Sequence, residues 1–152
     1  MDIRVTFDDV TLTGDLAVVA GLLALEPGPK SSIIISLFSD ARAGAADELP
    51  DDETSRRGYW ADALSDDPEE STGSLLWLLQ REKQTEKTRL RAKAYAERSL
   101  QWMIRDGVAR AITVVAEWIG QGRLGLGIAV SRPDGTTERY RFEQIWQAAE
   151  AE

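Results

Sequence analysis

The sequence lacks two residue types that carry much of enzyme chemistry. Among its 152 residues there is no cysteine and no histidine. Their absence excludes cysteine nucleophiles, disulfide bonds, thiolate or imidazole metal sites, serine–histidine triads and histidine pH switches. Any catalysis would therefore have to use carboxylates, hydroxyls, lysine or arginine.

Long apolar runs and nucleotide motifs are missing as well. No run approaches the ~18–20 apolar residues that a membrane-spanning helix needs, and the first residues do not follow a signal-peptide pattern. We therefore expect a soluble chain made in the cytoplasm, with no membrane partner. No P-loop, G-x-S-x-G or S-x-x-K motif occurs. Four glycines come closest to a dinucleotide-binding pattern, but they lie in a predicted hairpin and there allow a close approach to the sheet: Gly120, Gly122, Gly125 and Gly127.

What the sequence does contain is enough apolar residues for a core, at 43 % of the chain with five tryptophans. The length suits a single domain over residues 1–152. The net charge is −8, but it is unevenly distributed: residues 1–80 carry −11 and residues 81–110 carry +5. A net-acidic chain is a poor candidate for nucleic-acid binding, so we expect no nucleic-acid partner.

The first half of the hydropathy pattern predicts a small N-terminal β unit followed by helices. Residues 1–28 contain a short alternating strand at 2–7, an apolar stretch at 15–25 and a final turn cluster. Three consecutive isoleucines within residues 32–38 favour a strand, whereas Pro29 just before them favours a short helix. We favour the helix.

Two central helices are predicted next. Residues 75–79 are apolar nearly all round a helix axis, so this helix should be buried. Residues 85–105 show the clearest helical period, with Tyr95 and Trp102 on the apolar side and Arg91 and Arg98 on the opposite, polar side. Trp77 and Trp102 are both expected in the core.

The last third predicts a three-stranded antiparallel meander. Strands at 112–118, 124–130 and 136–142 are separated by two glycine-containing turns, and residues 144–151 are expected to form a short closing helix. Residues 73–152 then form a core of helix and meander, and the fold class is α+β.

Residues 40–72 form a long acidic loop in this interpretation. Paired carboxylates can act in glycosidase chemistry or ligate calcium, but the spacing fits neither well, and a solvated loop is favoured. Within this loop, Arg57 and Trp60 flank Gly58 and indicate either an anchor onto the fold or a contact with a partner. We favour the anchor. The basic helix at 85–105 is expected to face solvent or a partner rather than phosphates, because its aromatics lie on the other side.

Several ordered motifs resemble those of a known family. Residues 57–62 (RGYWAD) resemble the R-G-W-W-G-D motif of Mu-like phage baseplate wedge proteins, the family of the Mu gene forty-six product. Residues 73–79 (GSLLWLL) resemble its G-S-R-L-W-L-L, and Arg81, Lys83 and Thr85 resemble its R-x-K-x-T. The resemblance extends over about residues 30–146 and, more distantly, to the small "lysozyme-like" wedge proteins of contractile tails. That wider group has a Glu-Pro-Arg triplet where this chain has residues 106–108 (DGV).

The resemblance implies a structural virion protein rather than an enzyme. Its expected partners are other baseplate wedge proteins and tail sheath or tube proteins, with several copies in each baseplate ring, assembled in the host cytoplasm. No catalytic, cofactor-binding or metal residue is expected. The alternatives are a carboxylate-dependent peptidoglycan hydrolase using Asp62 or Glu70, and, less favoured, a calcium-binding module. The candidate partner-binding residues are Arg57, Trp60, Asp62, Arg91 and Arg98.

Overall fold

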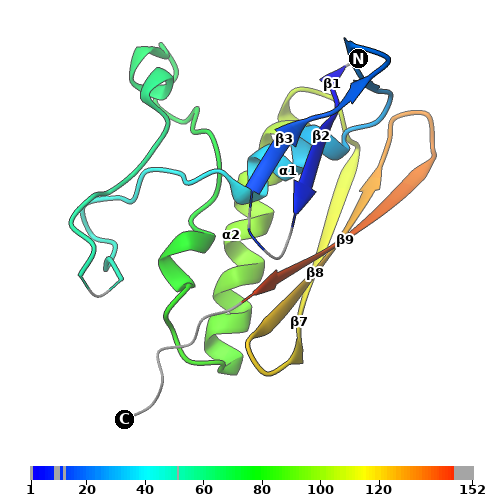
Figure 1. Ribbon diagram of the computed structural model, residues 1–152. Helices are drawn as coiled ribbons and strands as arrows, with labels where there is room; N and C mark the ends of the chain where they lie inside the picture. The colour runs from blue at the N-terminus through cyan, green and yellow to red at the C-terminus, as the bar shows by residue number, and fades with distance from the viewer. Residues whose placement is uncertain (1, 9–10, 12, 51, 146–152) are drawn as a thin grey trace.

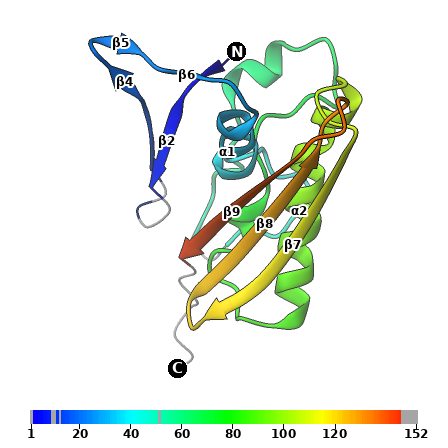
Figure 2. The same ribbon diagram turned by 90° about the vertical axis from the view of Figure 1, so that its right-hand side faces the viewer.

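The computed structural model describes residues 2–8, 11, 13–50 and 52–145 (Figures 1 and 2). Within these residues, two α-helices and a three-stranded antiparallel sheet form the centre of the molecule, and short strands precede them. The α+β class expected from the sequence is therefore confirmed.

The N-terminal β unit consists of three short two-stranded ribbons that meet at one point. Strands β2 (Val5–Asp8) and β3 (Thr13–Leu16) pair, as do β4 (Val18–Val19) with β5 (Leu22–Leu23) and β1 (Asp2–Ile3) with β6 (Leu25–Glu26). At the junction, backbone hydrogen bonds run from Arg4 to Ala24, from Ala24 to Ala17 and from Ala17 back to Arg4. The strand expected over residues 2–7 is thus divided at Arg4, because that residue turns from one ribbon into the next.

Helix α1 (Lys30–Phe38) confirms the helix favoured over a strand in this region. Pro29 precedes it and its carbonyl accepts the amide of Ile33 at 2.9 Å. Phe38, at the end of α1, stacks on Phe7 of β2 with ring centroids 4.3 Å apart and meets Phe142 edge-on at 5.6 Å. This row of rings joins the N-terminal unit, α1 and the C-terminal sheet.

The acidic loop contains one short 3-10 helix, η1 (Trp60–Leu64), and extends away from the helices (Figure 1). The apolar segment after it is buried as expected, and the helix expected over residues 75–79 is a 3-10 turn, η2 (Leu76–Leu79), that begins one residue later. Helix α2 (Glu86–Arg105) begins after Thr85, whose hydroxyl accepts the amide of Thr88. It ends next to Gly107, which has the left-handed φ of +74° expected there.

The predicted meander is present as β7 (Ala111–Gly120), β8 (Arg123–Ser131) and β9 (Thr137–Ile145), in the order β7-β8-β9. Helix α2 packs against the inner face of this sheet (Figure 2). The expectation of a helix from residue 144 is wrong at its start, because residues 144 and 145 continue the β9 ladder opposite β8. The rest of that expected helix, residues 146–151, lies outside the described residues.

The two tryptophans expected in the core differ in their burial. Trp77 is 2 % exposed and its indole donates to the Ala41 carbonyl at 2.8 Å, which confirms its core position. Trp102 is only partly buried and packs against the outside of the core, so the expectation of a core position holds only in part for it. It lies where α1 and α2 meet, and its indole donates to the Ser36 hydroxyl at 2.9 Å.

Gly125, one of the glycines of β8, lies on the outer face of the sheet. Its neighbours in the register are Glu117 of β7 and Glu143 of β9. Arg141 crosses the central strand here and contacts Glu117 at 3.1 Å, and a Cβ on Gly125 would come within 3.0 Å of Ile119. At Gly125 the expected close approach is made by side chains of the chain itself, whereas a Cβ on Gly127 would meet its nearest neighbour only at 3.8 Å.

Candidate functional site

Arg57 anchors the acidic loop to the core. Its guanidinium donates to Asp40 Oδ2 at 2.9 Å and to Glu53 Oε2 at 2.8 Å, and it lies over the ring of Trp77 with 4.4 Å between the guanidinium carbon and the ring centroid. Because Trp77 is buried, this cation–π contact fixes the loop to a rigid part of the fold. The anchor interpretation therefore holds for Arg57.

Arg57 and Glu53 each shift the pKa of the other. The hydrogen bond from Arg57 holds the pKa of Glu53 below its ordinary value. Burial would lower the pKa of Arg57, but the hydrogen bonds and charges of Glu53 and Asp40 raise it above its ordinary value. Glu53 and Arg57 thus stay ionised at neutral pH and support one geometry of the loop.

Trp60 behaves differently from Arg57, and the anchor interpretation is wrong for it. It is 72 % exposed, at the start of η1, with its ring 5.6 Å from that of Tyr59. Leu64, one helical turn later, is 74 % exposed. The different positions of Arg57 and Trp60 have a local cause. Arg57 and Gly58 both have positive φ values, +52° and +107°, so the chain changes direction between the anchored arginine and the tryptophan. We call Tyr59, Trp60 and Leu64 the aromatic knob.

Asp62 links the segment that carries the aromatic knob to Thr72. Its two carboxylate oxygens accept the backbone amide of Thr72 at 2.9 Å and the Thr72 hydroxyl at 2.7 Å. Glu70, the other acid considered for hydrolysis, accepts the hydroxyl of Ser65. Both carboxylates hold the loop together in the described structure.

The two helix arginines have different surroundings. The prediction that Arg91 lies on the face opposite Tyr95 is wrong: the guanidinium donates to the Tyr95 hydroxyl at 3.3 Å and pairs with Glu82. Residues four apart are neighbours on a helix, so this spacing signals the contact. Arg98 is exposed, and its side chain makes no ion pair or hydrogen bond with the described part of the chain.

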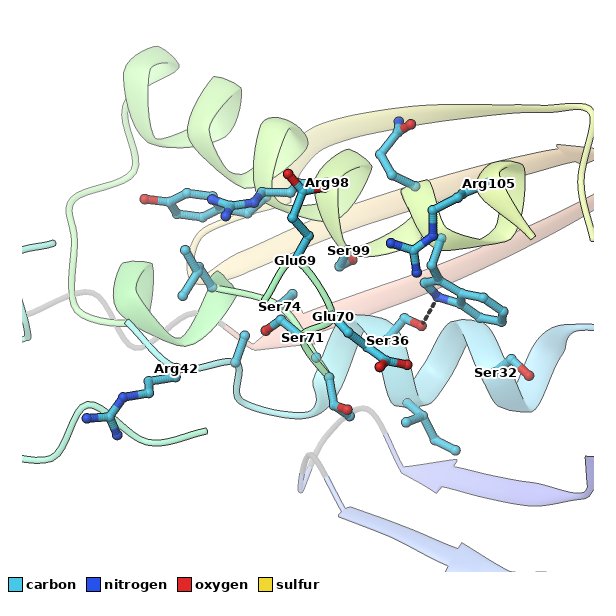
Figure 3. Close-up of a pocket in the computed structure, with 18 of the residues that line it drawn as sticks. Ser32, Ser36, Arg42, Glu69, Glu70, Ser71, Ser74, Arg98, Ser99 and Arg105 are labelled. Carbon is cyan, nitrogen blue, oxygen red and sulfur yellow. Dashed lines mark hydrogen bonds between the residues drawn. The ribbon is translucent and has the colours of Figure 1, made fainter. Parts of the chain in front are cut away.

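Arg98 borders a groove of about 710 Å³ between α1, α2 and residues 68–75 (Figure 3). Figure 3 shows Glu69 reaching toward Arg98 of α2, while Glu70 of the same segment points toward α1. The groove brings basic and acidic side chains together in similar number. Thr72, which binds Asp62, also lines this groove, so the loop that carries the knob forms one of its walls.

A second exposed apolar element was missed as a candidate in the sequence. The hairpin of β4 and β5 stands away from the helices and the sheet (Figure 2), and Val18, Val19 and Leu22 are exposed by 61 %, 62 % and 74 %. Its signal in the sequence is the uncharged run at residues 16–25.

Two features of the described residues bear on the alternatives. Among the described residues, no three aspartates or glutamates gather so that they could hold a metal ion. Within the same residues, no helix has the length and apolar character required to cross a membrane.

An α+β module that holds apolar side chains outside its core has the features of a protein that assembles with other proteins. The comparisons with known proteins agree. The family model described as phage protein GP46 matches residues 29–137. The chain therefore belongs to the phage GP46 family, as the resemblance of its motifs indicated.

Two relatives are similar over most of their length. The chain is 43 % identical to baseplate protein gp46 of Escherichia phage Mu over 130 residues, which cover 86 % of this chain and 88 % of the phage protein. It is 38 % identical to the Mu-like prophage FluMu protein gp46 of Haemophilus influenzae over 133 residues, 88 % of this chain and 90 % of the relative. A structural role in the phage tail baseplate is supported by this family membership.

Proposed function

We propose that the chain is a non-catalytic wedge component of the baseplate that joins neighbouring tail proteins through the aromatic knob. The observation that carries this proposal is the contrast between Arg57, fixed on Trp77, and Trp60, which is largely exposed only three residues later. A tryptophan that is held in place and left in water is the kind of residue that dominates binding energy at protein interfaces.

The loop is already fixed before it binds a partner, so binding requires little further ordering of its backbone. Arg57 fixes one end of the loop and Asp62 binds Thr72 at the other. A loop that already has its bound shape loses less conformational entropy on association. Arg57 and Asp62 thus act by positioning Trp60, and Arg91 holds α2 to the segment before it.

Charge defines the expected partner surface. The knob is followed by five carboxylates in residues 62–70, and no basic residue lies among them. A partner with an apolar pocket bordered by lysine or arginine would match this surface and associate faster with it. Exposed Arg98, on the other side of the groove, supplies the opposite charge for a second contact. We expect such partners among the larger wedge proteins and the sheath or tube proteins, with several copies in each ring assembled in the host cytoplasm.

Incorporation into tails tests the proposal. A Mu-like prophage with its own copy of the gene deleted is supplied with the wild-type chain or with Trp60→Ala, and tails are purified after induction. We expect Trp60→Ala to leave the melting temperature of the isolated chain unchanged and to remove the chain from the tails. Leu90→Ala serves as a matched control, because Leu90 is 51 % exposed on α2, away from the knob.

The enzyme alternative is tested in the same preparation. Purified chain is added to peptidoglycan, and clearing is compared for the wild type and for Asp62→Asn. Clearing that disappears with Asp62→Asn would contradict the non-catalytic proposal, and so would tails that incorporate Trp60→Ala at the wild-type level.

A further inference from the structure

The β4–β5 hairpin is apolar on both of its faces. Residues 16–25 contain no charged or polar side chain. In a two-stranded ribbon, successive side chains point to opposite faces, so the pair Val18–Leu23 lies on one face and the pair Val19–Leu22 on the other. All four side chains are exposed, and neither face has the polar residues of a face that remains in water.

The hairpin is also held in a fixed direction. The three backbone hydrogen bonds that link Arg4, Ala17 and Ala24, at 2.8–2.9 Å, form a closed ring at its base. The ribbon beside it is attached to the body, since the Val5 amide donates to Ser31 Oγ at 2.9 Å and Phe7 stacks on Phe38. The β4–β5 hairpin therefore holds its exposed apolar side chains in a fixed orientation relative to the body.

The turn at the tip of the hairpin contains an apolar residue at a position where the backbone conformation favours a polar residue or glycine. Ala20 and Gly21 have φ values of +51° and +79°. The first of these positions favours Asn, Asp or Gly, because a Cβ is unfavourable in the left-handed region. Alanine stands there instead, which keeps a polar side chain out of the tip.

Charges surround the base of the hairpin and not its tip. Asp2, Asp15 and Glu26 form an acidic collar there, and Arg4, 3.5 Å from Glu26, offsets only part of it. An anionic lipid surface would repel this collar. A second copy of the chain would bring two acidic collars together, and packing hairpin against hairpin would cover only one face of each.

From these observations we propose that the hairpin inserts into an uncharged apolar slot of a different baseplate protein, with lysine or arginine at the mouth of the slot. The slot covers both faces of the hairpin, and its basic mouth meets the acidic collar. This inference rests on the proposed joining function and adds a second contact with a partner of stated chemistry.

Photo-cross-linking in assembled tails tests the contact. Val19→benzoylphenylalanine is supplied to the prophage without its own gene, tails are irradiated, and cross-linked peptides are sequenced. We expect one cross-linked tail protein other than this chain, joined within an uncharged apolar segment that has lysine or arginine beside it. Thr136→benzoylphenylalanine, in the exposed β8–β9 turn, is the control and should not yield that product. Cross-links to a second copy, to lipid or to no partner would overturn the proposal.

Two substitutions separate docking from folding. Leu22→Gln is expected to lower incorporation into tails about 30-fold, as for an interface hot spot. Ala20→Asn should keep or raise the melting temperature, because asparagine tolerates the turn, and should still lower incorporation. Normal incorporation of both variants overturns the proposal. If both hairpin variants are incorporated normally while Trp60→Ala is not, the joining function stands and only the hairpin inference fails.

Discussion

The guanidinium of Arg57 lies over the indole of Trp77, with 4.4 Å between the guanidinium carbon and the ring centroid. The two residues are twenty positions apart, one in the acidic loop and one in η2, and the contact joins an exposed segment to the buried core. Trp77 is in turn fixed by its hydrogen bond to the Ala41 carbonyl. This pair explains how a long acidic loop keeps one shape and presents Trp60 outward.

Arg57→Ala should destabilise the chain by about 1–3 kcal/mol, because it removes the cation–π contact and two partly exposed ion pairs. For a chain of this size this corresponds to a fall in melting temperature of roughly 2–10 °C. Thermal unfolding followed by circular dichroism measures it. Arg57→Lys keeps the charge and should recover part of the loss. An unchanged melting temperature for Arg57→Ala would show that the loop is not anchored there.

Gly73→Ala should prevent stable folding. Gly73 has a φ of +95°, and a Cβ would lie 2.3 Å from the Ser39 carbonyl oxygen, a backbone atom that cannot move aside. Gly107→Ala is the matched control, since Gly107 also has a positive φ but, among the described residues other than its chain neighbours, no atom lies within 4 Å of a Cβ placed there. The control should lose only about 1 kcal/mol. Equal losses for the two variants in urea unfolding would count against the close approach at Gly73.

Trp77→Ala should cost about 3–5 kcal/mol, the usual range for a fully buried aromatic residue. Trp102→Ala should cost less, about 2 kcal/mol, because the side chain is only partly buried and its indole bonds to Ser36 at the edge of the groove. Urea unfolding of both variants measures the difference. A larger loss at Trp102 than at Trp77 would contradict the burial described here.

Glu53→Gln should lower stability at neutral pH, and the difference from the wild type should shrink as the pH falls below about 4.5. The reason is that Arg57 holds the pKa of Glu53 below its ordinary value of 4.5, so the stabilisation is present above that value and is lost as the folded carboxylate takes up a proton. Melting temperatures between pH 3 and pH 7 measure it. Glu48→Gln, at an exposed position of the same loop, is the control variant.

The regular elements could largely be predicted from the sequence. The period of residues 85–105 defined α2, and alternation with glycine turns defined the meander, because both patterns depend on local geometry that repeats along the chain. The C-terminal end was less predictable. Gln144 pairs across the sheet with Leu124, and this long-range ladder overrides the local preference for a helix.

The candidate site was only partly visible in the sequence. Arg57 and Trp60 were singled out together, yet one is anchored and the other is exposed. Arg91 was assigned to the wrong side of α2, although its spacing from Tyr95 would have shown their contact. Composition cannot distinguish a buried aromatic from an exposed one, because each has the same apolar surface to cover.

The sequence by itself determined the α+β class, the family motifs, the helix and strand periods and the exclusion of cysteine and histidine chemistry, since these follow from residue identity and spacing. Only the tertiary structure decided which apolar residues are left uncovered. Residues 16–25 are more apolar than the strands of the sheet, yet the strands meet α2 whereas the hairpin is turned outward at the junction of Arg4, Ala17 and Ala24. Burial is decided by what packs against a surface, and that depends on contacts between segments far apart in the chain.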